Sequence, residues 1–284
     1  MQHYYHHHLF NMNNLLKGKK GIIFGALNDK SIAWQVALKC NEQGAEFVLT
    51  NAPIAMRMGE INKLAEACNH AKIIACDVSK NEDMENLISQ SMEILGGKID
   101  FILHSVGMSL NIRKGRTYTD LDYKWTHETY DISSMSFHRL LQTCYKMDAI
   151  NDWGSVIALS YIAAQRVFPD YNEMADAKAL LESVARSFGY HYGKAKKVRV
   201  NTISQSPTPT TAGSGVKGFG DFFDYASALS PLGNASAEAC ADYCVLMFSD
   251  LSRMVTMQNL FHDGGFSNTG FSYDVFKMMG KTEE

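Results

Sequence analysis

The chain has 284 residues, of which 46% are hydrophobic and 20% are charged, and its formal net charge at pH 7 is -3. This composition is typical of a soluble globular protein with a large core, and the length suits one large α/β domain. The small negative charge argues against a general nucleic-acid-binding protein, and no apolar run approaches the ~18 residues of a membrane-spanning helix.

The N-terminal segment differs from the rest of the chain. It carries four of the ten histidines, at positions 3, 6, 7 and 8, and lacks the basic start and apolar middle of a secretory signal. A metal site would need partner ligands at a recognisable spacing, and the sequence offers none. We therefore expect residues 1–17 to be a disordered extension, either native or left from an expression tag, and we predict no metal site.

The six cysteines are scattered and none forms a CxxC pair. Scattered cysteines of this kind indicate buried thiols in a reducing compartment. The chain is therefore predicted to be cytoplasmic.

Short β-rich runs alternate with amphipathic helical segments from Gly18 onward. The predicted strands are 21–25, 46–51, 72–78, 99–105, 155–160, 198–204 and 259–265. Because these runs are apolar along both faces, they favour a parallel sheet covered by helices on each side. We predict one doubly wound Rossmann-type domain over residues 18–268, with a seven-stranded parallel sheet flanked by helices and a C-terminal tail at 269–284.

The longest irregular stretch, residues 204–222, is rich in Ser, Thr, Pro and Gly. It follows a predicted strand, and ligands of such sheets bind at the carboxyl ends of the strands. Long loops inside compact domains are often binding loops. We interpret this stretch as a substrate-binding loop that closes over cofactor and substrate; a flexible surface loop is the alternative.

The turn after the first predicted strand is a candidate dinucleotide site. A pyrophosphate needs a closely approaching backbone and the free amides of a helix N-terminus. Gly25 would make the turn, and Ser31 would cap a helix that starts at Ile32. The G-x-G-x-x-G fingerprint is absent, so an ordinary strand-to-helix turn explains this segment equally well.

The ends of the next three strands carry further candidates. The second strand has no acidic residue at its tip, so the choice between NAD and NADP stays open, and Arg57 could meet a 2′-phosphate. After the third strand, Asp77 could hold an adenine edge or cap the next helix. After the fourth, Gly107 would let the backbone approach a cofactor, whereas His104 is expected to be structural.

Tyr161, Tyr171 and Lys178 form the third group of candidates. Tyr161 directly follows the fifth strand, and Tyr171 and Lys178 are seven positions apart, which predicts one shared helix face. All three are expected at the carboxyl edge of the sheet. From these residues alone, a proton-handling site and a pair of core aromatics with a surface lysine are both possible.

A series of motifs makes the interpretation specific. In chain order they are the turn from Gly25 to Ala33, Asp77-Val78, HSVG (104–107), DISSMSF (131–137), LSY (159–161), the Tyr-x6-Lys of Tyr171 and Lys178, VRVNTIS (198–204) and DGGF (263–266). Over residues 18–267 the sequence resembles the enoyl-acyl-carrier-protein reductases, divergent members of the short-chain dehydrogenase/reductase superfamily. Most of that superfamily carries Tyr-x3-Lys. Two such matches, Tyr190 to Lys194 and Tyr192 to Lys196, are expected to face away from the cofactor.

The resemblance implies a reaction and its partners. Such enzymes transfer a hydride from NADH, or from NADPH, to C3 of a trans-2-enoyl thioester in the last step of each fatty-acid elongation cycle. Tyr171 would stabilise the enolate, Lys178 would hold the nicotinamide ribose, and Tyr161 would help to orient the substrate. The substrate would arrive on an acyl-carrier protein, and the enzyme would be a homotetramer.

The resemblance also implies contacts for individual residues. Ser109 would contact the substrate through its backbone. The cofactor contacts would be Gly25, Ser31, Ile32, Asp77, Val78, Ser105, Val106, Gly107, Lys178, Thr208, Thr210, Thr211 and Ala212. Gln205, Ser206 and Pro209 depart from the small-Gly and Arg positions of many relatives, which leaves the loop contacts and the cofactor preference open.

Three further possibilities follow from the sequence. The basic residues Arg113, Lys114 and Arg116 could dock the acidic carrier protein, or could form a solvated basic loop. The alternative functions are a short-chain carbonyl reductase and a non-catalytic dinucleotide-binding regulator on the same fold.

Overall fold

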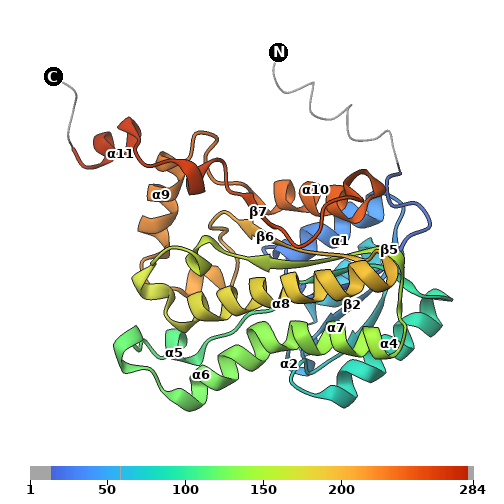
Figure 1. Ribbon diagram of the computed structural model, residues 1–284. Helices are drawn as coiled ribbons and strands as arrows, with labels where there is room; N and C mark the ends of the chain where they lie inside the picture. The colour runs from blue at the N-terminus through green and yellow to red at the C-terminus, as the bar shows by residue number, and fades with distance from the viewer. Residues whose placement is uncertain (1–13, 58, 281–284) are drawn as a thin grey trace.

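The computed structural model describes residues 14–57 and 59–280. Within them, seven strands form one parallel sheet in the order β3-β2-β1-β4-β5-β6-β7 (Figure 1). The strands are β1 (Lys20–Phe24), β2 (Glu46–Asn51), β3 (Lys72–Ala75), β4 (Ile99–His104), β5 (Ile150–Ser160), β6 (Arg199–Gln205) and β7 (Asn259–His262). The predicted doubly wound Rossmann-type domain is confirmed.

Helices cover both faces of this sheet (Figure 1). They are α1 (Ile32–Glu42), α2 (Pro53–Met56), α3 (Glu60–Ala67), α4 (Asn81–Leu95), α5 (Leu110–Arg113), α6 (Tyr123–Tyr130), α7 (Ser136–Lys146), α8 (Glu173–Lys196), α9 (Phe219–Leu229), α10 (Ala237–Phe248) and α11 (Tyr273–Met278). Apolar residues of α1, α3 and α10 pack on one face. Those of α4, α7 and α8 pack on the other.

The two-sided core follows from the alternation of side chains along each strand. Ile23 of β1 belongs to the cluster with α1 and α10, and its neighbour Ile22 belongs to the cluster with α4, α7 and α8. Both side chains are fully buried, and burying one isoleucine contributes about 1.5–3 kcal/mol. This burial on both faces is why the predicted strands are apolar throughout.

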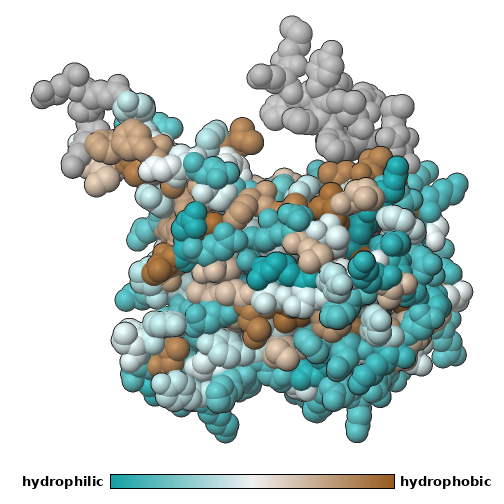
Figure 2. All heavy atoms as spheres, viewed as in Figure 1, coloured by the Kyte–Doolittle hydropathy of each residue, from teal (hydrophilic) through white to brown (hydrophobic). Residues whose placement is uncertain are grey.

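The packed structure extends beyond the predicted domain limits at 18 and 268. Leu16 is fully buried, and its backbone N–H donates to the carbonyl of Gln43 at 3.0 Å. At the other end, α11 packs against α9, and the Ser272 hydroxyl donates to the carbonyl of Ala228 at 2.7 Å. Hydrophobic residues are visible near this end of the molecule in Figure 2. Phe276 of α11 is exposed.

Three expectations concern the chain as a whole. All six cysteines are free and buried, as predicted. None of the helices described is both long and apolar enough to span a membrane. No cluster of three or more His, Cys, Asp or Glu side chains in residues 14–57 and 59–280 could hold a metal ion, and the N-terminal histidines lie outside those ranges.

Gly21 offers a test of the sheet packing. A Cβ atom at this position of β1 would lie 2.2 Å from the Phe101 ring, so we expect Gly21→Ala to lower the free energy of unfolding by about 1–3 kcal/mol through overpacking. Gly193 of α8 has open space around its Cβ position, so Gly193→Ala is the control and should be neutral or stabilising by about 0.5–1 kcal/mol. Urea denaturation measures both, and equal midpoints for the two variants would contradict the packing described.

Candidate active site

The carboxyl ends of the parallel strands meet at one edge of the sheet, at the left in Figure 1, between α5 and α6 below and α9 above. Tyr161 directly follows β5, and Tyr171 ends a 3-10 turn, Pro169–Tyr171. Their ring centroids lie 5.0 Å apart. The fold therefore brings the two predicted tyrosines together at the predicted edge.

Lys178 is anchored beside them. Its buried ammonium donates a hydrogen bond to the carbonyl of Leu159 at 2.8 Å, two residues before Tyr161. Burial lowers the pKa of Lys178 to about 8, and the nearby Glu182 carboxylate opposes this shift. The lysine is thus a core residue of α8 rather than a surface residue.

Glu182 is a member of this group that the sequence analysis missed. Its carboxylate accepts from the Ser160 hydroxyl at 2.7 Å and is mostly buried, and burial raises its pKa. The available signal was its spacing, because a glutamate four positions after Lys178 lies on the same helix face. Glu182 places an acidic group one turn along α8 from the lysine.

The prediction that Tyr171 and Lys178 share one helix is wrong. Helix α8 begins at Glu173, because Asn172 has φ 48° and ψ -140°, which no helix accommodates. The Asn172 side-chain amide donates to the carbonyl of Arg116 at 2.6 Å, and this contact supports the unusual backbone. Tyr171 therefore sits in a turn ahead of the helix, and tertiary packing rather than helical spacing brings it to Tyr161.

Both tyrosines are suited to donate a proton in a hydrogen bond. Burial raises the pKa of Tyr161 and of Tyr171 above the usual value, so both stay protonated at neutral pH. Neither hydroxyl is hydrogen-bonded to another residue that the structure describes. Each is therefore free to donate to a substrate atom.

Two aromatic side chains missed by the sequence analysis surround Tyr161. The Phe168 ring centroid lies 5.6 Å away, and the Phe222 ring lies edge-on at 6.4 Å. Phe222 belongs to α9 and packs at 4.9 Å from Phe168. The tyrosines therefore stand against an apolar wall that includes a residue from the end of the predicted loop.

The predicted loop 204–222 is shorter than expected, because β6 continues to Gln205 and α9 begins at Phe219. The Thr208 hydroxyl donates to the carbonyl of Ser206 at 3.0 Å. The Thr210 hydroxyl accepts from the Gly213 N–H at 2.9 Å, and Ala212 precedes a 3-10 turn. These interactions stay within the loop.

Thr211 joins the loop to the turn after β1. Its exposed hydroxyl accepts from the side-chain amide of Asn28 at 2.9 Å. The two segments predicted to contact a cofactor are therefore neighbours in the fold. Asn28 was not among the predicted residues, and only its place between Gly25 and Ser31 pointed to it.

Gly25 is required by close backbone approach. Its φ is +98°, and a Cβ atom there would lie 1.8 Å from the carbonyl oxygen of Ser105, at the end of β4. The turn after β1 therefore packs directly on the segment that carries Ser105 and Val106. Gly107 is different, because a Cβ there would meet Met174 only at an ordinary 3.4 Å.

Ser31 occupies the predicted N-cap position of α1, with extended backbone, but its side chain does not cap the helix. Its hydroxyl instead accepts from the N–H groups of Leu27 and Asn28, at 3.0 and 3.2 Å. The serine thus closes the turn and leaves the first amides of α1, beginning at Ile32, without a side-chain cap. Such a helix N-terminus suits an anionic group.

Asp77 does not cap α4, whose N-cap is Lys80. Its carboxylate accepts from the N–H and the hydroxyl of Ser79, at 3.0 and 2.6 Å, and the hydroxyl bond is the main cause of its lowered pKa. The carbonyl of Val78 accepts from Arg139 at 2.7 Å. The segment after β3 is therefore held by hydrogen bonds within it and by one from α7.

His104 is structural, as predicted. Its Nε2 lies 2.8 Å from the Ser136 hydroxyl, and its ring packs between Phe24 and Phe137. Burial lowers its pKa to about 3, with a further contribution from the charge of Lys178. The imidazole is therefore neutral at physiological pH.

Ser109 begins α5 on the other side of the tyrosines. Its hydroxyl accepts from the Ile112 N–H at 3.0 Å and donates to the Glu173 carboxylate at 2.6 Å. The hydroxyl is therefore engaged in both directions, and the contact of Ser109 with substrate through its backbone stays a prediction.

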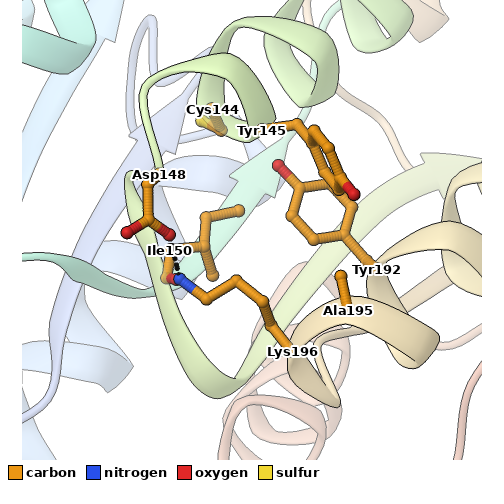
Figure 3. Close-up of a pocket in the computed structure, with 7 residues that line it drawn as sticks. All are labelled: Cys144, Tyr145, Asp148, Ile150, Tyr192, Ala195 and Lys196. Atoms are coloured by element: carbon orange, nitrogen blue, oxygen red, sulfur yellow. Dashed lines mark hydrogen bonds and ion pairs between the residues drawn. The ribbon is translucent and has the colours of Figure 1, made fainter.

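The two Tyr-x3-Lys matches lie in the last turns of α8, at the opposite end of that helix from Lys178. A cavity of about 200 Å³ lies at this end. Tyr145, Tyr192 and Lys196 are among its lining residues, which Figure 3 draws as sticks. The Tyr192 hydroxyl donates to the carbonyl of Leu141 at 2.8 Å, and Lys196 pairs with Asp148. These residues hold the helix end in place.

The lowered pKa of Lys178 predicts a pH-dependent stability. Between about pH 8 and the ordinary value of 10.5, the unfolded chain binds more protons at this residue than the folded chain does. The free energy of unfolding should therefore rise over this interval by about 1–3 kcal/mol relative to Lys178→Met, measured without ligand. Parallel pH profiles for the two proteins would mean that Lys178 is not buried as a charged group.

Comparisons with known proteins identify the family of this chain. The family described as "Enoyl-(Acyl carrier protein) reductase" matches residues 25–267. The NADH enoyl-acyl-carrier-protein reductase FabI of Rickettsia bellii is 34% identical over 258 residues, which cover 90% of this chain and 96% of the relative.

Solved structures give the same result. The FabI–NADH complex of Alistipes finegoldii has a TM-score of 0.92 and 62% identity, covering 95% of this chain and 94% of that chain. The enoyl-acyl-carrier-protein reductase of Bacillus cereus, solved with NADP+ and an indole naphthyridinone, has a TM-score of 0.84 and 27% identity, covering 90% of this chain and 99% of that chain. The tyrosine pair, the anchored lysine and these matches together establish that the chain belongs to the enoyl-acyl-carrier-protein reductase family.

Proposed function

We propose that this protein transfers a hydride from NADH to C3 of a trans-2-enoyl thioester carried by an acyl-carrier protein, as the last step of each fatty-acid elongation cycle. The observation that carries the proposal is the packing of Tyr161 against Tyr171 at the carboxyl edge, beside a lysine anchored to Leu159. Family membership supports the choice of reaction.

The residues present suit a nicotinamide dinucleotide. The uncapped amides at the start of α1 would hold the pyrophosphate, and the turn closed by Gly25 and Ser31 would let the backbone approach it. Lys178 would hold the nicotinamide ribose, and Thr211 would lie beside the same turn. NADH, when bound, supplies the hydride.

The tyrosines act on the charge that the reaction creates. Hydride addition at C3 of an enoyl thioester places negative charge on the thioester oxygen. A hydroxyl aimed at that oxygen stabilises the transition state, because the charge develops there. Tyr171 is the proposed donor, Tyr161 shapes and orients the substrate, and the Lys178 charge favours the developing anion.

NADH is proposed over NADPH on the names of the relatives, which include a FabI–NADH complex and NADH-dependent FabI. The neighbour solved with NADP+ keeps NADPH as the alternative. Arg57, at the end of α2, is the residue that would meet a 2′-phosphate. The homotetramer and the cytoplasmic location stay predictions.

Two rival functions have weaker support. A short-chain carbonyl reductase would use Tyr-x3-Lys, and both such pairs lie at the far end of α8. A non-catalytic regulator would have little need for two tyrosines with unbonded hydroxyls at the cofactor edge.

Tyr171→Phe tests the reaction. Removing the proposed oxyanion donor should lower the rate of enoyl-dependent NADH oxidation, followed at 340 nm with a 2-enoyl thioester, by about 100-fold. Tyr190→Phe is the matched control, because it removes an exposed hydroxyl from α8 at the far end, and it should retain full activity. Absence of oxidation in the wild type with NADH and NADPH alike would refute the proposal.

Arg113 and Lys114 test the carrier-protein partner. Both are exposed at the end of α5 and neither forms an ion pair with another described residue, so they could attract an acidic protein. Changing both to Glu should raise KM for the enoyl-acyl-carrier-protein about tenfold, since rim charges contribute mainly to association. KM for the corresponding small enoyl thioester should not change. An equal rise for both substrates, or for neither, would contradict docking at this surface.

A further inference from the structure

Glu173 is a buried carboxylate that the proposed reaction does not use. It is the first residue of α8, two positions after Tyr171, and it has no exposed surface. Buried carboxylates are rare because the loss of hydration is costly unless polar groups replace the water. The surroundings of this side chain therefore indicate what it does.

Three donors converge on one oxygen of Glu173. The Ser109 hydroxyl donates to Oε1 at 2.6 Å, the Thr129 hydroxyl lies 2.9 Å from it, and the Asn111 side-chain amide lies at 3.1 Å. All three partners are themselves buried. The other oxygen, Oε2, is buried and has no hydrogen-bond partner among the residues described.

The donors share a location. Ser109 begins α5, Asn111 lies within it and Thr129 lies near the end of α6, so all belong to the segment after β4 that flanks the tyrosines. Glu173 belongs to the helix that carries Lys178. Its carboxylate therefore joins two parts of the site that are 44 to 64 residues apart in the chain.

Residues next to Glu173 also form hydrogen bonds with the segment after β4. Asn172 donates to the carbonyl of Arg116, and Asp176 accepts from the hydroxyls of Tyr118 and Tyr130, at 3.1 and 3.2 Å. Among the hydrogen bonds of the described residues, Ser109 bonds to Glu173 and not to Asn172 or Asp176. Position 109 is where the enoyl substrate is expected to meet backbone.

We propose that Glu173 is a positioning residue: its carboxylate holds Ser109, and through it fixes the substrate-side backbone relative to Tyr171. The inference rests on the proposed reductase function, because it concerns the enoyl substrate of that reaction. Tyr171 remains in place through its own packing on Tyr161, so loss of Glu173 should affect substrate binding more than the cofactor.

Ser109→Ala and Glu173→Gln test this pair. Each should raise KM for the enoyl thioester about tenfold, since Ser109→Ala removes the donor to Oε1 and Glu173→Gln weakens the acceptor. The Kd for NADH, measured by fluorescence without substrate, should stay within about twofold. The double variant should show no further rise in KM, because both changes break the same interaction.

Thr126→Val is the matched control. Thr126 is in the same buried network, where its hydroxyl contacts Asn111 at 3.1 Å, but it does not bond to Glu173. It should lower the thermal midpoint about as much as Ser109→Ala while leaving KM unchanged. Because Ser109→Ala removes only a hydroxyl, it remains informative even where Glu173→Gln impairs folding.

Three outcomes would overturn the inference: an unchanged KM in Ser109→Ala, KM effects that multiply in the double variant, or an equal rise in KM for Thr126→Val. These outcomes are distinct from failure of the reductase proposal. That failure would appear as no enoyl-dependent oxidation in the wild type. Failure of the present inference leaves the wild type active and removes only the expected KM effects of the Ser109 and Glu173 variants.

Discussion

The hydrogen bond from the Lys178 ammonium to the Leu159 carbonyl is the contact on which the site depends. It joins a buried side chain of α8 to the next-to-last residue of β5, two residues before Tyr161. A buried ammonium is tolerated only with such partners, so the bond limits how α8 can slide along the sheet. The position of the helix in turn decides where the preceding residues, including Tyr171, can lie.

The rest of the edge is built by close backbone contact. The turn after β1 packs on the carbonyl of Ser105 so tightly that only glycine fits at position 25. Ser31 closes that turn internally and leaves the helix amides open, and Asn28 ties it to Thr211 of the loop after β6. The proposed cofactor site is thus built from three segments that the parallel strands bring to one edge.

Much of the fold and part of the candidate site were predictable from the sequence. Runs apolar on both faces gave the parallel sheet, because alternate side chains such as Ile22 and Ile23 enter separate cores. The tyrosines and the lysine were found by motif.

The start of α8 was missed because Asn172 adopts a positive-φ backbone conformation that the spacing of residues cannot reveal. Glu173 was missed because a glutamate at a helix N-terminus is ordinarily a solvated residue stabilised by the helix dipole. Its three donors come from one segment that lies 44 to 64 residues earlier in the chain, and only the fold brings that segment to Glu173.

The central claim is that the hydride is delivered to C3 of an enoyl thioester. The most direct measurement uses NADH with deuterium at both C4 positions of the nicotinamide, with mass and NMR analysis of the product. An enoyl reductase yields a saturated thioester with deuterium at C3 and a solvent-derived proton at C2, and this is the product we expect. Deuterium on the carbonyl carbon, with the double bond intact, would contradict the account and identify a carbonyl reductase instead.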